Sequence, residues 1–167
     1  MKYIITRLSS FRNVWWSLAN EYDYIDAKLS ADWEQITKTV VQADSYHHLC
    51  SIHGSTATYY NYLQPEFTHT SIQDNEPVSN FGGSAIIRQV YKKPVIFDEV
   101  NYEGNLRQRW GRMSGPEMLY YTWQGIIAGT YVTHGECYSS NTGTSDTIFI
   151  RNGGEFKGTS WKRISLL

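Results

Sequence analysis

The stretch Lys93-Pro-Val-Ile-Phe-Asp-Glu-Val-Asn-Tyr-Glu103 points most directly to the fold class of this chain. Its apolar, β-rich run is typical of a strand that is buried on both faces, and the run ends in the acidic pair Asp98-Glu99. A second stretch, Val14-Trp-Trp-Ser-Leu-Ala-Asn-Glu-Tyr-Asp23, has the same form and places Asn20-Glu21 after a strand-like run. We therefore expect each glutamate at a strand tip, where the backbone is rigid and the side chain meets solvent.

Helix-like and strand-like segments alternate outward from these runs. The pattern predicts helices at residues 3–11, 31–43, 57–63, 84–91 and 116–128. It predicts strands at residues 14–19, 48–52, 69–73, 94–98 and 130–134, and a tail that is mostly loop with a final turn of helix. Helices of this length between strands specify parallel pairing. The predicted class is therefore α/β, a partial TIM-type (β/α) barrel of about five parallel strands, a half-barrel that forms one domain over residues 1–167.

Composition narrows the possible partners. The formal net charge is -1, from 15 basic and 16 acidic residues, so nucleic acid is not expected as a partner. The amino terminus has neither a signal peptide nor a membrane span, which predicts a cytoplasmic protein as written, or a secreted one if the chain is part of a longer protein. Six Trp and thirteen Tyr offer platforms for sugar rings. Cys50 and Cys137 lie in strand-like runs and are expected as buried thiols.

Both acidic stretches resemble those of a known enzyme group. Trp16-Ser-Leu-Ala-Asn-Glu-Tyr-Asp23 resembles the end of strand four in clan-A retaining glycoside hydrolases, which are (β/α)8 barrels, and Pro94-Val-Ile-Phe-Asp-Glu99 resembles the end of strand seven. Other stretches resemble bacterial glycosidases with apiosidase-like barrels: His48-Leu-Cys-Ser-Ile-His53, His69-Thr-Ser-Ile-Gln73, Asn101-Tyr-Glu-Gly-Asn105, Tyr131-Val-Thr-His-Gly-Glu136 and Gly153-Gly-Glu-Phe-Lys-Gly158. The resemblance covers strands four to eight only. Because a half-barrel exposes a strand edge and an apolar face, we expect a homo-oligomer.

The resemblance implies a retaining O-glycosyl hydrolase that acts on poly- or oligosaccharides without a cofactor. It implies Glu21 as general acid/base, Glu99 as nucleophile and Asn20 as a partner of the sugar 2-hydroxyl. The expected carbohydrate substrate contains a β-glycosidic or an α-arabinofuranosidic bond. Further substrate contacts are expected from Trp16, His53, Gln73, Tyr102, Trp110, His134 and Glu136.

Two other functions remain open on the residues alone. The first is a carbohydrate-binding barrel fragment without catalysis, because binding tolerates the loss of strands that catalytic geometry requires. The second is a metal-dependent hydrolase. Its ligands would be His53, His69, His134 and Glu136, which fall at the ends of three predicted strands. They form no two-ligand motif such as His-x-His, so this pattern is diffuse.

Overall fold

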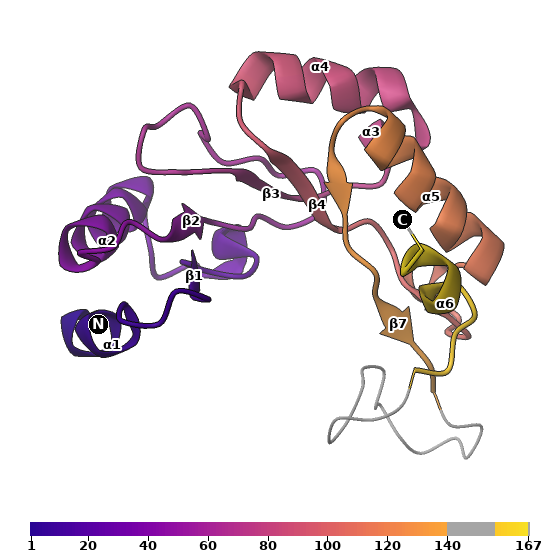
Figure 1. The fold of residues 1–167 in the computed structure, drawn as a ribbon, viewed down its shortest axis with the longest axis horizontal. Helices are drawn as coiled ribbons and strands as arrows, with labels where there is room; N and C mark the ends of the chain where they lie inside the picture. Colours follow the sequence, from indigo (N-terminus) through magenta and orange to yellow (C-terminus); the bar gives the residue numbers. More distant parts are fainter. Residues whose placement is uncertain (140–155, 167) are drawn as a thin grey trace. The chain divides into compact units, whose positions relative to one another are not determined.

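The computed structural model describes residues 1–139 and 156–166. Parallel strands alternate with helices along the chain, which confirms the predicted α/β class and is consistent with a partial (β/α) half-barrel (Figure 1). The residues group into two compact units. The first comprises Met1–Gln73 and Val90–Ile96, and the second comprises Asp74–Gln89 and Phe97–Leu167.

The first unit contains two helices and a parallel strand pair. Its elements are α1 (Lys2–Leu8), β1 (Trp15–Ser17), the 3-10 helix η1 (Tyr22–Tyr24), α2 (Ser30–Ala43), β2 (Leu49–Ser51), β3 (Thr70–Gln73) and the start of β4 (Val95–Glu99). β1 pairs with β2 in parallel, with Trp16 opposite Cys50. At the start of β3, the amide of Thr70 donates to the carbonyl of Pro94 at 3.0 Å. These elements confirm four of the predicted strands in position and the first two helices.

The core of the first unit lies between the helices and the strand pair. α1 packs against α2, and Ile5, Val40 and Cys50 form a buried cluster. Trp16 and Leu18 of the first strand-like run pack against this cluster. Burial, together with the charges of Asp44 and Glu66, raises the pKa of the Cys50 thiol to about 12. Cys50 is therefore a neutral, buried thiol, as expected from the sequence.

The predicted helix at residues 57–63 is wrong. This segment is a series of turns, and Ala57 has a left-handed backbone with φ 58°. Tyr60 and Tyr62 are buried while the residues on either side of Tyr62 are exposed, so the segment alternates with the period of extended chain. The hydroxyl of Tyr62 donates to the carbonyls of Ile52, at 2.9 Å, and Ser71. These tertiary contacts outweigh the local helical preference.

The second unit packs its strands beside helix α5. Its elements are α3 (Glu76–Ser79), α4 (Phe81–Tyr91), the end of β4, β5 (Glu103–Gly104), η2 (Arg109–Gly111), α5 (Gly115–Ile127), β6 (Tyr131–Val132), β7 (Glu136–Cys137) and α6 (Trp161–Ile164). α5 begins as predicted with Pro116 in its first turn and a capping box between Ser114 and Glu117. Gly129, with φ 75°, follows it. Thr133 donates its amide to the carbonyl of Phe97 at 3.0 Å, next to β6.

Three short elements of the second unit differ from expectation. β5 and β7 are two-residue strands, too short to leave a periodic pattern, and they pair in parallel with Glu103 opposite Glu136. The predicted strand at 130–134 is confirmed only at Tyr131–Val132. α6 confirms the expected turn of helix in the tail. Residues 151–155 of the tail, including Gly153-Gly154, lie outside the described residues. No helix in the described part of the chain is both long and apolar enough to span a membrane.

Candidate functional site

Glu21 lies four residues beyond β1, in the first unit. Its backbone is left-handed, with φ 48° and ψ 57°, and its side chain is half-buried. Hydrogen bonds to His53 hold the chain on both sides of the Asn20-Glu21 pair. The amide of His53 donates to the carbonyl of Ala19 at 3.1 Å, and its carbonyl accepts from the amide of Tyr22 at 2.9 Å. The extended strand pair therefore fixes the backbone that presents Glu21.

The imidazole of His53 lies between two polar residues of the first unit, Ser71 and Gln73. Its Nδ1 lies 3.2 Å from the hydroxyl of Ser71, and its Nε2 lies 3.2 Å from Oε1 of Gln73. The structure therefore brings together two predicted substrate contacts, His53 and Gln73, beside the backbone that carries Asn20 and Glu21. The imidazole of His53 is buried and held at both nitrogens, which fixes its orientation.

Asp23 adds a carboxylate to this part of the first unit. It accepts hydrogen bonds from the amide of Ser55, at 2.7 Å, and from its hydroxyl. Burial raises the pKa of Asp23, but these bonds and the nearby His53 outweigh burial and lower it. Asp23 is therefore ionised at neutral pH.

Trp16, another predicted substrate contact, is bonded inside the first unit. Its indole Nε1 donates to the carboxylate of Asp44 at 2.9 Å. The same carboxylate accepts from the amide of Tyr46 at 3.1 Å and from the amide of His48 at 2.7 Å, and it lies 2.9 Å from His48 Nδ1. Burial raises the pKa of Asp44, but bonds from His48 and Trp16 outweigh it and lower that pKa to about 2. Trp16 thus stabilises a buried carboxylate.

Glu99 is the last residue of β4 and belongs to the second unit. Thr133 supports the end of this strand, because its hydroxyl donates to the carbonyl of Asp98 at 2.7 Å. Burial and the negative charge of Glu99 raise the pKa of the buried Cys137 thiol to about 11. Glu99 therefore lies near the neutral thiol of Cys137. The side chain of Glu99 is half-buried at the end of the strand, as the sequence predicts.

Tyr102 and Trp110, which were expected to stack on a sugar, contact each other. The rings of Tyr102 and Trp110 are perpendicular, with centroids 5.8 Å apart. The amide of Tyr102 also donates to the carbonyl of Trp110 at 2.7 Å. The ring of Tyr102 packs on Gly135, where an added Cβ would lie 2.6 Å from the ring. Trp110 keeps 38% of its surface exposed and is the more accessible of the pair.

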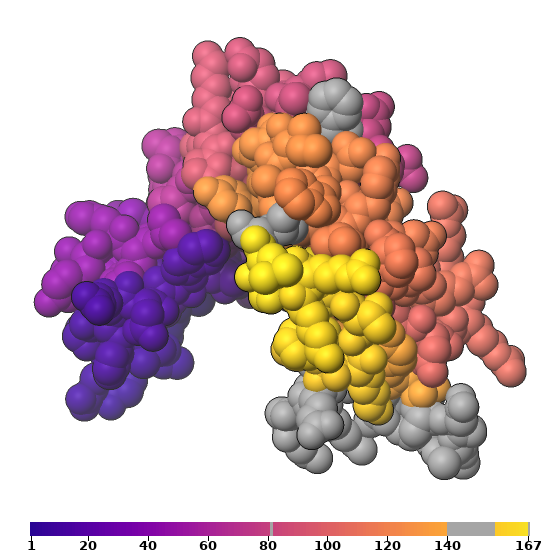
Figure 2. Space-filling view, turned by 45° about the vertical axis from the view of Figure 1, so that its right-hand side comes forward, coloured from indigo at the N-terminus to yellow at the C-terminus, as the bar shows by residue number. Residues whose placement is uncertain are grey.

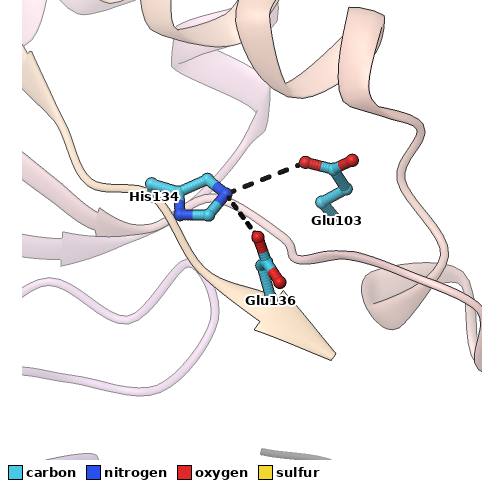
Figure 3. A group of neighbouring side chains, drawn as sticks. All are labelled: Glu103, His134 and Glu136. Atoms are coloured by element: carbon cyan, nitrogen blue, oxygen red, sulfur yellow. Dashed lines mark ion pairs between the residues drawn. The ribbon is translucent and has the colours of Figure 1, made fainter. Parts of the chain in front are cut away.

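His134 and Glu136 converge with a third residue, Glu103, which the sequence did not single out (Figure 3). Nε2 of His134 lies 3.5 Å from Oε1 of Glu136 and 3.8 Å from Oε2 of Glu103. One ligand atom from each of the three residues lies within 4.8 Å of the others. Among the described residues, this is the group of histidine, cysteine and carboxylate side chains that is close enough to share a metal ion.

The two carboxylates of this cluster also hold the C-terminal segment. Glu103 accepts from the amides of Thr159, at 2.7 Å, and Ser160, at 3.1 Å, and from both hydroxyls. Burial raises the pKa of Glu103, but the bonds from Ser160 and Thr159 outweigh burial and lower it. Glu136 accepts from the amides of Lys157, at 2.7 Å, and Gly158, at 3.0 Å. Four consecutive amides therefore bind two buried carboxylates.

His69, the remaining residue of the expected metal set, is in the first unit with His53. Its Nδ1 lies 2.9 Å from the hydroxyl of Thr68, and its ring lies against Trp15 with centroids 5.1 Å apart. Within the second unit, the partner of His134 and Glu136 is Glu103. The signal for Glu103 in the sequence was weak, a carboxylate four residues after Glu99. Its role depends on the parallel pairing of β5 with β7.

Comparisons with known proteins give one informative match. No protein-family model matches the chain, and no curated protein matches it. A solved structure from Bacteroides vulgatus, described as a "putative glycoside hydrolase", matches with a TM-score of 0.91 and 58% sequence identity. The match covers 98% of this chain and 31% of that protein. This chain is therefore similar, over nearly its whole length, to less than a third of the Bacteroides vulgatus protein.

Proposed function

We propose that this chain carries the two catalytic carboxylates of a retaining glycoside hydrolase. The observation that carries the proposal is the 58% identity, over 98% of the chain, with the Bacteroides vulgatus protein. The positions of Glu21 and Glu99 support it, because each follows or ends a parallel strand at the carboxyl end, where (β/α) barrel enzymes place their catalytic residues. Glu21 is proposed as general acid/base and Glu99 as nucleophile.

The proposed reaction has two steps. In the first, Glu21 donates a proton to the glycosidic oxygen while a carboxylate oxygen of Glu99 attacks the anomeric carbon, so the bond to the leaving group breaks and a glycosyl ester forms. In the second, Glu21 takes a proton from water, whose oxygen attacks the same carbon and releases Glu99 as a carboxylate. Two inversions give net retention. Glu21 carries both proton transfers and Glu99 supplies the nucleophile, so the proposal includes no cofactor.

The backbone of Glu21 supports a functional role. A left-handed conformation costs a residue with a Cβ of the order of 1 kcal/mol, and such positions cluster at active sites, where they aim a side chain. The hydrogen bonds of His53 on both sides hold this conformation. Asn20, exposed and adjacent, is proposed to bind the sugar 2-hydroxyl.

Sugar recognition is proposed for two pairs of residues. His53 and Gln73 present fixed hydrogen-bonding groups in the first unit. In the second unit, Trp110 offers a partly exposed ring, held by Tyr102, on which the apolar face of a sugar can stack. The proposed substrates are poly- or oligosaccharides with a β-glycosidic or an α-arabinofuranosidic bond.

The proposal is tested by hydrolysis of a panel of aryl glycosides. The panel is applied to this chain and to a chimera in which it replaces the matching part of the Bacteroides vulgatus protein. We expect phenol release that Glu99→Ala abolishes, and that azide restores as a glycosyl azide of inverted configuration. Glu21→Ala should slow hydrolysis most for substrates with poor leaving groups, since these depend on acid assistance.

Glu34→Gln is the matched control, because Glu34 is an exposed carboxylate of α2. It should hydrolyse the panel at the wild-type rate. Full activity of Glu99→Ala would overturn the proposal. So would the failure of both the unsubstituted chain and the unsubstituted chimera to cut any substrate. Sugar binding without hydrolysis, measured by calorimetry, would then assign a binding role in its place.

A further inference from the structure

The cluster of Glu103, His134 and Glu136 has unsatisfied polar atoms at its centre. Of the residues that the structure describes, none gives a hydrogen bond to Nε2 of His134 or to Oε1 of Glu136, although both atoms are buried. The side chain of Glu136 is 3% exposed and that of His134 is 12% exposed. Figure 3 shows the imidazole pointing its Nε2 at both carboxylates. A buried polar atom without a hydrogen-bond partner lowers the stability of the fold unless a bound ion or ligand satisfies it.

The separations do not suit direct hydrogen bonds. Nε2 of His134 is 3.5 Å from Glu136 and 3.8 Å from Glu103, whereas an N–H to oxygen hydrogen bond spans about 2.7 to 3.2 Å. They suit a shared ion better. Ligand atoms at about 2.0 to 2.2 Å from a tetrahedral zinc ion lie about 3.3 to 3.6 Å apart. The 3.5 Å separation of His134 from Glu136 falls in this range and the 3.8 Å separation from Glu103 lies just above it, and one ligand atom from each of the three residues lies within 4.8 Å of the others.

Charge points to the same conclusion. Two carboxylates are buried here, and in the described part of the chain the ion-pair partner of both is His134. Buried carboxylates are costly unless cations or hydrogen-bond donors compensate their negative charge. A divalent cation offsets both charges. It also uses the lone pair of a neutral imidazole, which a proton would occupy.

We propose that Glu103, His134 and Glu136 bind a divalent transition-metal ion of the zinc class. One imidazole nitrogen and two carboxylate oxygens are a common donor set for zinc, with water as a fourth ligand, and the imidazole disfavours calcium and magnesium. This set of ligands includes neither Glu21 nor Glu99, and it does not depend on the proposed hydrolase activity.

The surroundings of the cluster match those of metal ligands, whose free oxygens are normally hydrogen-bonded. Oε2 of Glu136 is held by the amides of Lys157 and Gly158, which leaves Oε1 to bind the ion. Glu103 accepts from the amide of Thr159 at Oε1 and from the amide of Ser160 at Oε2, the oxygen that faces His134. The ion would therefore fix the C-terminal segment. This segment packs against other residues of the same unit, with α6 against α5 (Figure 2).

The proposal is tested by metal binding, without reference to catalysis. The chain is treated with EDTA, desalted and titrated with zinc chloride by calorimetry, and bound zinc is counted by mass spectrometry. We expect about one ion per chain and a higher Tm in zinc, because an ion that binds the folded chain stabilises it. Cobalt chloride should give the visible absorption bands of tetrahedral cobalt. Calcium chloride should raise the Tm much less.

Two variants and a control make the assignment specific. His134→Ala leaves every hydrogen bond of the two carboxylates to residues 157–160 in place, and it should weaken zinc binding at least about 100-fold, since removing even a hydrogen-bond partner of a ligand costs about 10 to 100-fold. Glu136→Gln should have the same effect. His47→Asn removes an exposed histidine and should bind zinc as the wild type does; asparagine tolerates the left-handed backbone of that residue.

Two results would overturn the proposal. The first is a wild-type chain that binds no zinc and shows no cobalt bands or change in Tm. The second is zinc binding that survives both His134→Ala and Glu136→Gln. Loss of binding in both variants, with binding kept in His47→Asn, supports the site.

Discussion

Gly158 lies directly against the carboxylate of Glu103. A Cβ added at residue 158 would lie 2.5 Å from the carboxyl carbon of Glu103 and 2.7 Å from Oε1 of Glu136. Both carboxylates are also held by the amides of this segment, so neither can move away without breaking hydrogen bonds. The absence of a side chain at residue 158 is therefore what lets the C-terminal segment dock on the two glutamates.

Gly158→Ala is expected to destabilise the chain by about 1 to 3 kcal/mol, the usual cost of forcing extra atoms into a packed site. The free energy of unfolding is measured by urea titration. Gly82→Ala is the matched control, because its Cβ would meet only Oδ1 of Asn80 at 3.2 Å near the start of α4. Alanine there should be neutral or stabilising. Equal effects of the two substitutions would contradict this account of Gly158.

Ser160→Ala should lower the free energy of unfolding by about 1 to 3 kcal/mol at neutral pH, because it removes a hydrogen bond to the buried carboxylate of Glu103. The pKa of Glu103 is lowered in the folded chain from its ordinary value of 4.5. The stability from this shift is therefore present above pH 4.5 and is lost as the pH falls through the lowered pKa. Without the Ser160 hydroxyl the shift is smaller.

The measurement is the Tm as a function of pH, in EDTA, for the wild type and Ser160→Ala. The two Tm curves should lie apart at neutral pH and converge as acid protonates Glu103. Ser165→Ala serves as control, since its exposed hydroxyl donates to the carbonyl of Lys162. A gap that stays constant down to the lowest pH would show that Ser160 does not act through Glu103.

Asp44→Asn tests the buried network that holds Trp16. The pKa of Asp44 is about 2, so its contribution to stability is full above its ordinary value of 3.8 and disappears as the pH falls toward 2. We expect Asp44→Asn to cost about 2 to 4 kcal/mol at neutral pH, because hydrogen bonds to a buried charge are lost. The difference from wild type should shrink in acid. Unfolding free energies measured across this range provide the test.

Trp16→Phe tests whether Trp16 stabilises the fold, binds sugar, or does both. It removes the indole N–H that donates to Asp44, and it should destabilise the chain by about 1 to 3 kcal/mol. Glycoside KM, measured in the chimera, shows whether the ring also contacts sugar. A change in KM without a loss of stability would contradict the structural role of the indole.

Glu21→Gly is expected to be more stable than Glu21→Ala by about 1 kcal/mol, because glycine adopts the left-handed backbone without the clash of a Cβ. Both substitutions should slow hydrolysis most for substrates with poor leaving groups. Urea titrations of the two variants give the comparison. If alanine were the more stable of the two, the left-handed conformation of Glu21 would not be a source of strain.

Local pattern was enough to predict the main elements. The apolar run that ends at Glu99 forms β4, and the helix that begins beside Pro116 ends before Gly129, since proline and glycine mark helix ends through their own backbone preferences. The same pattern predicted that Glu21 and Glu99 would follow strands. It failed at residues 57–63, where the burial of Tyr60 and Tyr62 imposed an extended path.

The sequence by itself determined the alternation of strands and helices, because hydrophobic periodicity and end signals act over a few neighbouring residues. Only the tertiary structure decided that Glu103 meets His134 and Glu136. That meeting depends on the parallel pairing of two strands of two residues each, and on Ser160, which is 57 residues from Glu103 in the chain. Contacts between such distant residues leave no periodic trace, because they are set by how strands pair and pack and not by local preference.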